Sequence, residues 1–268
     1  MASFFRPAGL RRAAAAAALI AAVLAFGAPP ATAAEGEFVP PAQDWSFDGI
    51  FGTFDRGALQ RGYKIYSESC ASCHAMKFLA YRNLGEAGGP EFGEAEVKAI
   101  AAAAAVRDGP NEDGEMFERP GLPSDRFVSP FPNDNAARAA NNGALPPDLS
   151  VIAKARAHGP DYLFALLTGY GEPPEGFELR EGMNYNAAFP GHQIAMPQPL
   201  SDGAVEYTDG TPTDLRQLAR DVTTFLVWAA EPKLEARKRA GFQVMIYLVL
   251  LAGLLYFTTK KLWTGVEH

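Results

Sequence analysis

Cysteine and histidine are both scarce in this chain of 268 residues, which contains two cysteines and four histidines. A structural zinc site needs four ligands, and neither a second cysteine pair nor a close histidine pair is present to complete one. Both cysteines lie in the single motif Cys70-Ala71-Ser72-Cys73-His74. The chemistry of the cysteines must therefore be explained within that motif.

Three interpretations of the motif compete: half of a zinc site, a redox-active thiol pair, and attachment of a c-type haem. The zinc interpretation lacks ligands, and a thioredoxin-like pair belongs in a βαβ context that the surrounding sequence does not supply. The histidine directly after Cys73 fits haem. The thiols of Cys70 and Cys73 would form thioethers with the vinyl groups, and His74 Nε2 would bind the iron. The motif predicts one covalently bound haem c.

Basic residues are scarce in the middle of the chain. The whole chain has a net charge of −7, but residues 1–34 hold three Arg and no acid, and residues from Lys233 onward hold six Lys or Arg and two Glu. Residues 35–232 are left with 15 basic and 29 acidic side chains, a net charge of −14. Such a domain repels nucleic acid and attracts basic partners, although the acidity also serves solubility.

The N-terminus has the pattern of a secretory signal. Arg6, Arg11 and Arg12 precede an uncharged Ala- and Leu-rich stretch at 13–28, and Ala31-Thr32-Ala33 offers a cleavage site after Ala33 or Ala34. An uncleaved anchor is the alternative, but the apolar run is short and broken by glycine and proline. We expect residues 1–34 to be cleaved and residues 35–232 to be exported to the periplasm.

A second apolar segment lies near the C-terminus. Residues 240–259 carry no charge and lie between the basic runs 237–239 and 260–261. As a helix, twenty residues span about 30 Å, the thickness of the hydrocarbon core of a bilayer. A buried soluble helix of this length would normally show a polar face. We therefore expect a basic linker at 233–239, a single membrane anchor at 240–259, and a cytoplasmic tail at 260–268.

The pattern between these ends predicts a mainly α-helical, cytochrome c-like domain with long loops. Asp55 is a candidate N-cap for a helix whose apolar stripe leads to Cys70. Thr211, followed by Pro212, is a candidate N-cap for a second helix, which Glu231-Pro232 would end. The apolar stripe of the first helix is Leu59, Tyr63 and Tyr66, and that of the second is Leu215, Leu218, Val222, Phe225 and Trp228.

The residues alone leave several candidates for the sixth iron ligand. Met76 lies too close to His74 to reach the opposite haem face, which leaves Met116, Met183 and Met196 as thioether candidates. Met196 lies in a segment stiffened by Pro197 and Pro199, which could present its sulfur rigidly. Ligation by His158 or His192 is the alternative, and so is a methionine that only packs.

From Asp48 to Val266 the sequence resembles the cytochrome c1 family, the haem subunits of the cytochrome bc1 complex. The most specific segment is Asn141-Asn142-Gly143-Ala144-Leu145-Pro146-Pro147-Asp148-Leu149-Ser150, followed by the C-terminal anchor. Other matching segments are residues 61–66, 108–117, 136–140, 166–170, 228–232 and the Met196 loop.

The resemblance implies a set of site residues. Cys70 and Cys73 would hold the haem, and His74 and Met196 would be its axial ligands. Other residues would line the pocket, with Arg156 near a propionate: Asn141, Ala144, Leu145, Pro146, Pro147 and Tyr162. Some bacterial relatives carry a disulfide near the Met loop, and Gly171 stands where some of them have Cys. With no further cysteine here, packing would have to provide that rigidity.

The resemblance also implies a role. The chain would not be an enzyme by itself; it would carry one electron from the Rieske iron–sulfur protein to a soluble cytochrome c, beside cytochrome b in a dimeric complex of the inner membrane. The acidic stretch 108–118 would dock the basic partner. The alternative is a membrane-anchored c-type haem peroxidase or gas sensor with an open iron site. A purely structural subunit is a further alternative.

Overall fold

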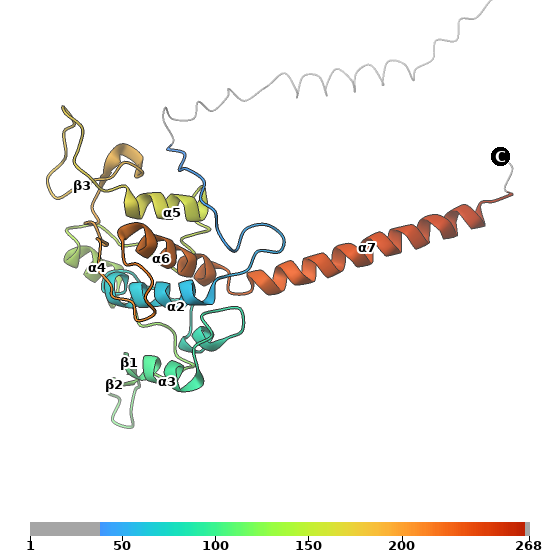
Figure 1. Ribbon diagram of the computed structural model, residues 1–268. Coiled ribbons are helices and arrows are strands. Elements are labelled where there is room, and N and C mark those ends of the chain that lie inside the picture. The colour runs from blue at the N-terminus through green and yellow to red at the C-terminus, as the bar shows by residue number, and fades with distance from the viewer. Residues whose placement is uncertain (1–37, 266–268) are drawn as a thin grey trace, which may run out of the picture. The chain divides into compact units, whose positions relative to one another are not determined.

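The computed structural model describes residues 38–265, so the predicted signal sequence lies outside the described residues (Figure 1). The described chain is mainly α-helical with long loops, as predicted. The helices are α2 (Arg56–Ile65), η1 (Tyr66–Cys70), η2 (Tyr81–Gly85), α3 (Glu94–Ala102), α4 (Asp134–Ala140), α5 (Gly159–Thr168), η3 (Pro190–His192), α6 (Leu215–Ala230) and α7 (Leu234–Leu262). Two short antiparallel hairpins pair β1 (Ala105–Asp108) with β2 (Phe117–Pro120), and β3 (Asn184–Tyr185) with β4 (Gln193–Ile194).

Helices α2 and α6 pack against each other, and α5 covers another side of α6 (Figure 1). The predicted N-cap of α2 is confirmed, because the Asp55 carboxylate accepts a hydrogen bond from Ala58 N at 3.0 Å. The two helices approach closely at Gly62, where a Cβ atom would lie 2.2 Å from Asp221 O. Any larger residue at position 62 would push α2 away from α6.

The predicted start of α6 is wrong. The helix begins at Leu215 and its N-cap is Asp214, whose carboxylate accepts from Arg216 N and Gln217 N at 3.1 Å each. Thr211 and Pro212 precede the helix, and Thr213 O instead accepts from Gly203 N at 2.7 Å. The predicted end at Glu231-Pro232 is confirmed.

The core lies between α2, α5 and α6. The predicted stripes supply much of it: Leu59, Leu218, Val222, Phe225 and Trp228 are all fully or almost fully buried. Helix α6 is in fact buried on nearly all sides from Leu218 to Ala229, so its stripe is wider than predicted. Tyr63, Tyr66, Tyr81, Phe127 and Phe225 form a connected group of aromatic ring contacts between α2 and α6.

A buried ion pair joins α2 to α6. The Asp221 side chain is 1% exposed and accepts from Arg61 Nε at 2.8 Å and from Arg61 Nη2 at 3.1 Å. Tyr207 and Gln217 donate the remaining hydrogen bonds to the same carboxylate. Because every lone pair of this buried charge is used, the pair fixes the orientation of α2.

The predicted membrane span lies wholly within α7, whose apolar part has the length and composition to cross a membrane and is not buried in the protein. The segment predicted as a linker, residues 233–239, is helical. Helix α7 begins at Leu234, so this segment forms its first turns. Its residues are good helix formers without glycine or proline. Leu234 is buried, and Glu235 pairs with Arg56 at 2.7 Å, which ties the helix to the domain.

Candidate haem site

The cysteine motif begins in a turn of π-helix that continues α2. Ala71 N donates to Tyr66 O at 2.8 Å, and both Cys73 N and His74 N then donate to Cys70 O. The sequence predicted a regular helical stripe as far as Cys70, and the wider π turn departs from that register. Such turns are frequent at functional sites. The result is a compact turn that displays two thiols and an imidazole.

Both cysteine thiols are free and half-buried. Burial, with a smaller contribution from Cys73, raises the pKa of the Cys70 thiol to about 12. A redox-active thiol pair or a zinc site depends on a stabilised thiolate. The surroundings of Cys70 favour the neutral thiol instead, which agrees with the exclusion of a thioredoxin-like pair.

His74 is held as a neutral imidazole with one nitrogen free. Its Nδ1 lies 2.8 Å from Pro147 O. A carbonyl can only accept, so Nδ1 carries the proton and Nε2 keeps its lone pair. Burial lowers the pKa of His74, although the hydrogen bond to Pro147 partly opposes this. A fixed tautomer with Nε2 available is the state that an iron ligand requires.

The segment that carries Pro147 runs beside the motif. Leu149 N donates to Ala75 O at 2.8 Å, and two side chains of the segment accept from the backbone that follows His74. These are Asp148, which accepts from Lys77 N, and Ser150, which accepts from Phe78 N, both at 3.0 Å. We call residues 70–78 and 141–150 together the His74 side. The structure thus brings Pro147 next to His74.

Among the other predicted pocket residues of the His74 side, Asn141 makes a local hydrogen bond and the rest are partly exposed apolar residues. Asn141 Nδ2 donates to Ala137 O at 2.8 Å, so this side chain closes the last turn of α4. Ala144 and Pro146 are half-buried, and Leu145 is 37% exposed. The segment that leads to Pro147 therefore keeps apolar side chains partly exposed, and an apolar ring could cover them.

Met196 is half-buried and tied down through its own carbonyl. Tyr170 Oη donates to Met196 O at 3.1 Å, and Asn184 Nδ2 donates to the same oxygen at 3.3 Å. The pairing of Asn184 with Ile194 brings the loop to this point. The sequence predicted that packing would replace a disulfide here, and these hydrogen bonds supply part of that rigidity.

Asn186 joins the methionine loop to the end of α5. Its side chain is fully buried, donates to Leu166 O at 2.7 Å, and accepts from Ala188 N and Phe189 N at 3.0 and 3.1 Å. Sequence reasoning missed both Asn184 and Asn186. The signal for them was weak: two amides in alternation, Asn184-Tyr185-Asn186, ahead of the loop.

Arg156 interacts with Tyr162, and Tyr162 interacts with Tyr170. Burial raises the pKa of Tyr162, and the charge of Arg156 opposes that shift, so the two side chains are close enough to interact. Tyr162 in turn adds to the rise in the pKa of Tyr170 that burial causes. We call residues 156–170 and 184–196 the Met196 side. Among residues 38–265, no hydrogen bond joins it directly to His74 or Pro147.

The other candidate ligands are placed less favourably. His158 is exposed and adopts a positive φ of 61° just before α5. The ring of His192 packs against Tyr185 and Phe177. Met116 is exposed in the β1–β2 loop, and Met183 is half-buried ahead of β3 without a backbone tether like that of Met196 among the described contacts.

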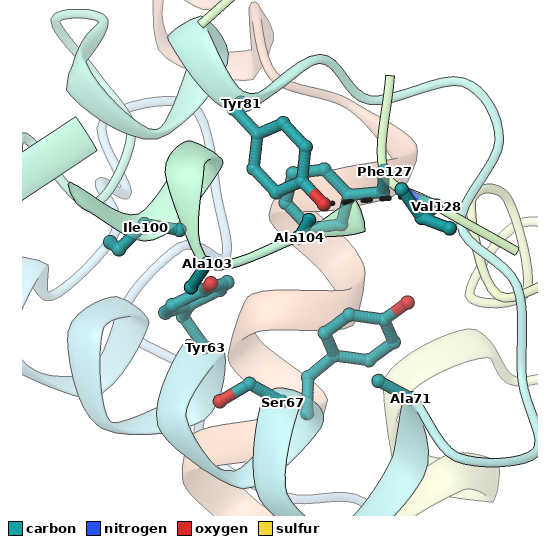
Figure 2. Close-up of a pocket in the computed structure, with 10 residues that line it drawn as sticks. Tyr63, Ser67, Ala71, Tyr81, Ile100, Ala103, Ala104, Phe127 and Val128 are labelled. Atoms are coloured by element: carbon teal, nitrogen blue, oxygen red, sulfur yellow. Dashed lines mark hydrogen bonds between the residues drawn. The ribbon is translucent and has the colours of Figure 1, made fainter. Parts of the chain in front are cut away.

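A cavity of about 390 Å³ lies behind the attachment turn (Figure 2). Tyr63, Ser67 and Ala71 line it from α2 and η1, and Tyr81, Ile100, Phe127 and Val128 face them (Figure 2). Of the motif residues only Ala71 lines it, and none of the predicted pocket residues does. It is therefore distinct from the site that the sequence predicted.

The donor set fits a haem better than a bare metal ion. Among the described residues, no group of three or more His, Cys, Asp or Glu side chains could hold a metal ion. Two free thiols, one imidazole with a free Nε2, and a tethered thioether are instead the donors that a c-type haem uses.

Comparison with known proteins agrees with this donor set. Residues 45–266 match the family model described as the Cytochrome C1 family. The chain is 56% identical to Cytochrome b/c1 of Bradyrhizobium diazoefficiens over 252 residues, which cover 87% of this chain but only 37% of that protein. It is 46% identical to cytochrome c1 of Rhodospirillum rubrum, covering 94% of this chain and 97% of the relative. A mitochondrial cytochrome c1 haem protein of Arabidopsis thaliana is 52% identical, covering 82% and 70%. The chain therefore belongs to the cytochrome c1 family, the haem c subunits of the cytochrome bc1 complex.

Proposed function

We propose that this chain carries one electron at a time from the Rieske iron–sulfur protein to a soluble cytochrome c during quinol oxidation. When bound, the haem supplies a one-electron iron couple. The observation that supports the proposal is that His74 is fixed through Nδ1, which leaves Nε2 available as a ligand, and the backbone of Met196 is separately held through its carbonyl. If His74 and Met196 both held the haem iron, no open iron site would remain for a substrate.

The residues of the site have separate tasks in this proposal. Cys70 and Cys73 would hold the haem covalently. Pro147 orients the imidazole through Nδ1, and Tyr170 and Asn184 position the methionine through its carbonyl. Arg156, exposed near Tyr162, would pair with a haem propionate, because a planar guanidinium matches a carboxylate. The remaining pocket residues, Asn141, Ala144, Leu145 and Pro146, would exclude water.

Spectroscopy of the haem-loaded protein tests this arrangement. We expect the ferric form to show the near-infrared charge-transfer band of methionine ligation, and the ferrous form not to bind CO rapidly. Met196→Leu should abolish the band, whereas Met183→Leu, a half-buried methionine ahead of the same loop, should leave it intact. Immediate CO binding by the unmodified protein would instead support a peroxidase or gas sensor with an open iron.

The acidic hairpin is the proposed docking surface for the soluble cytochrome c. Between β1 and β2, the side chains of Glu112, Asp113 and Glu115 are exposed, and Met116 lies exposed beside them. Asn111 fixes this loop, since its Oδ1 accepts from Asp113 N and Glu115 N at 3.1 and 2.8 Å. A rigid acidic tip around an apolar side chain suits a partner with a basic rim and an apolar centre.

Stopped-flow kinetics can test the docking surface. We expect Glu112→Gln to slow association with a basic cytochrome c several-fold at low ionic strength, with the difference disappearing at high salt. Glu206→Gln removes the same charge from an exposed position outside the hairpin and should have little effect. Equal slowing by both variants would mean that only net charge matters.

The proposed location is the cell inner membrane, with α7 as a single anchor, the haem domain in the periplasm and the C-terminus in the cytoplasm. The length and exposed apolar surface of α7 support the anchor, and the signal pattern at 1–34 supports the orientation. The proposed neighbours are cytochrome b and the Rieske protein in a dimeric complex. Protease digestion of right-side-out membrane vesicles should therefore remove the haem domain and spare the tail.

A further inference from the structure

Two large apolar side chains stand out from the haem domain at one loop. Residues 46–53 connect the buried aromatic rings of Trp45 and Phe54, and the tip of the loop presents Ile50, which is 69% exposed, and Phe51, which is 73% exposed. Adjacent exposed side chains of this size are costly in water. Their exposure therefore calls for something that covers them.

The backbone of residues 46–53 is fixed by hydrogen bonds and by two glycine turns. Thr53 N donates to Ser46 O and Asp48 N donates to Trp45 O, both at 3.0 Å. Gly49 adopts a φ of +67°, and a Cβ atom at Gly52 would lie 1.9 Å from Asp48 O, so glycine is required at both turns. These contacts fix the backbone in a form that directs Ile50 and Phe51 outward.

The loop is fastened to the base of α7. Lys238 Nζ donates to Phe47 O and Gly52 O, and so holds the two ends of the loop against the helix. The ring of Phe51 lies 5.6 Å from the ring of Phe242 in an edge-to-face arrangement. Phe242 is the third residue of the uncharged run 240–259. The apolar tip is therefore level with the point where α7 changes from charged to apolar.

We propose that Ile50 and Phe51 insert into the boundary between lipid headgroups and acyl chains, as a second membrane contact of the haem domain. The inference rests on α7 being the membrane anchor. The loop tip contacts the apolar part of α7 at Phe242, and the exposed Arg239, which directly precedes the uncharged run, can attract anionic headgroups. A stable protein partner would need about 800 Å² on each side, far more than two side chains supply.

A second contact would change how the domain sits on the membrane. A single helix leaves the domain free to tilt relative to the membrane surface. An inserted loop beside that helix limits this tilt, because tilting away would pull Ile50 and Phe51 out of the lipid. The haem domain would then stay at a constant height and inclination above the membrane.

Spin labelling can measure the depth of the loop in the full-length, haem-loaded chain in vesicles of phosphatidylcholine and phosphatidylglycerol. In that protein the thiols of Cys70 and Cys73 are consumed, so a cysteine introduced by Phe51→Cys is the only free one. Val249→Cys, exposed in the middle of α7, is the reference for a label inside the lipid. Asp113→Cys, exposed on the acidic hairpin, is the reference for a label in water. Unchanged haem spectra would verify that each variant is folded.

We expect the label at position 51 to collide more with lipid-soluble oxygen than with a water-soluble nickel chelate, as at position 249, and the label at position 113 to show the reverse. Collision mainly with the chelate at position 51, while position 249 stays in lipid, would overturn the insertion and leave the anchor standing. Protection from both reagents would also overturn it, by showing a protein cover. If position 249 itself meets the chelate, the anchor fails as well.

Discussion

His74 and Met196 are both fixed through backbone carbonyls, but the segments that carry them are built differently. A tyrosine hydroxyl donates to each carbonyl: Tyr66 Oη to His74 O at 3.2 Å, and Tyr170 Oη to Met196 O at 3.1 Å. The His74 side forms a turn that continues a packed helix. On the Met196 side, Met196 itself lies in a loop that follows a short hairpin with two residues in each strand.

The difference lies in which groups close the hydrogen bonds. On the His74 side, backbone amides of the turn itself satisfy Cys70 O, and side chains only buttress the segment that follows. On the Met196 side, the amides of Asn184 and Asn186 replace the regular structure that the loop lacks. Methionine ligation should therefore be the more easily lost of the two, and five variants can break or sharpen that comparison.

The largest effect should come from Asp221, which belongs to neither side. Asp221→Ala leaves the partly exposed guanidinium of Arg61 with only Asp209 and leaves Tyr207 and Gln217 without their acceptor. The expected cost is about 3 kcal/mol, the low end for breaking a buried pair. Urea unfolding followed by circular dichroism should show the loss. Both sides should weaken together, so the near-infrared methionine band should disappear in the same transition as the helices. Separate transitions would argue against a shared α2–α6 scaffold.

Asn186→Ala should act on the Met196 side alone. It leaves Leu166 O and two backbone amides without their buried partner, at a cost of about 2–3 kcal/mol. On heating, we expect the methionine band to be lost well before the helical signal. Asn83→Ala is the matched control, because Asn83 also caps backbone but lies in η2. If Asn83→Ala also removed the methionine band before the helical signal, the early loss would reflect lower stability of the whole domain and not the Met196 side.

Ser150→Ala is the corresponding change on the His74 side. Ser150 is fully buried, and its hydroxyl accepts only the single bond from Phe78 N among the described contacts. The expected loss is about 1 kcal/mol of unfolding free energy. The methionine band and the helical signal should still disappear together on heating. An early loss of the band would show that the two sides are coupled more tightly than their hydrogen bonds indicate.

The smallest effect should come from the two tyrosines. Tyr66→Phe or Tyr170→Phe removes one hydrogen bond and should cost about 0.5–1 kcal/mol at neutral pH. Burial raises the pKa of both hydroxyls above the ordinary value. The unfolded chain loses these protons near pH 10, so stability should be full below about pH 10 and fall above it, toward the folded pKa.

Alkaline unfolding curves measure this dependence. Each Tyr→Phe variant should lose less stability than the unmodified protein between neutral pH and pH 11, because one group no longer titrates. Only Tyr170→Phe should shift the pH at which the methionine band disappears. An equal shift from Tyr66→Phe would contradict the separation of the two sides.

Local patterns in the sequence were sufficient to predict α2, the apolar face and the end of α6, and the apolar part of α7. Asp55, the buried stripes and the end of α6 follow from capping and periodicity, and the five-residue motif contains its own turn. The start of α6 was predicted wrongly because Thr211-Pro212 and Asp214 are both plausible caps, and tertiary contacts of the preceding loop decide between them. Helix formers at 234–239 extend α7 beyond the charge boundary that marked a linker.

The Met196 side was less accessible from sequence for a physical reason. The hydrogen bonds that hold its separate segments together connect residues 10 to 26 positions apart in the sequence. The segments that they join have no periodic pattern. Asn184 and Asn186 read as ordinary loop residues until the fold brings Leu166 and Met196 to them. The contact between the first turn of α7 and the domain could not be predicted for the same reason, since Arg56 and Glu235 are 179 residues apart.

The start of α7 inside the haem domain determines where the chain can be cut. A soluble fragment ending at Pro232, the boundary suggested by charge and proline, would lose the buried Leu234, leave Arg56 without Glu235, and free the loop carbonyls that Lys238 holds. A fragment ending at Arg239 keeps all three contacts and omits the uncharged run. The first six residues of the anchor helix belong, in terms of stability, to the domain that the helix tethers.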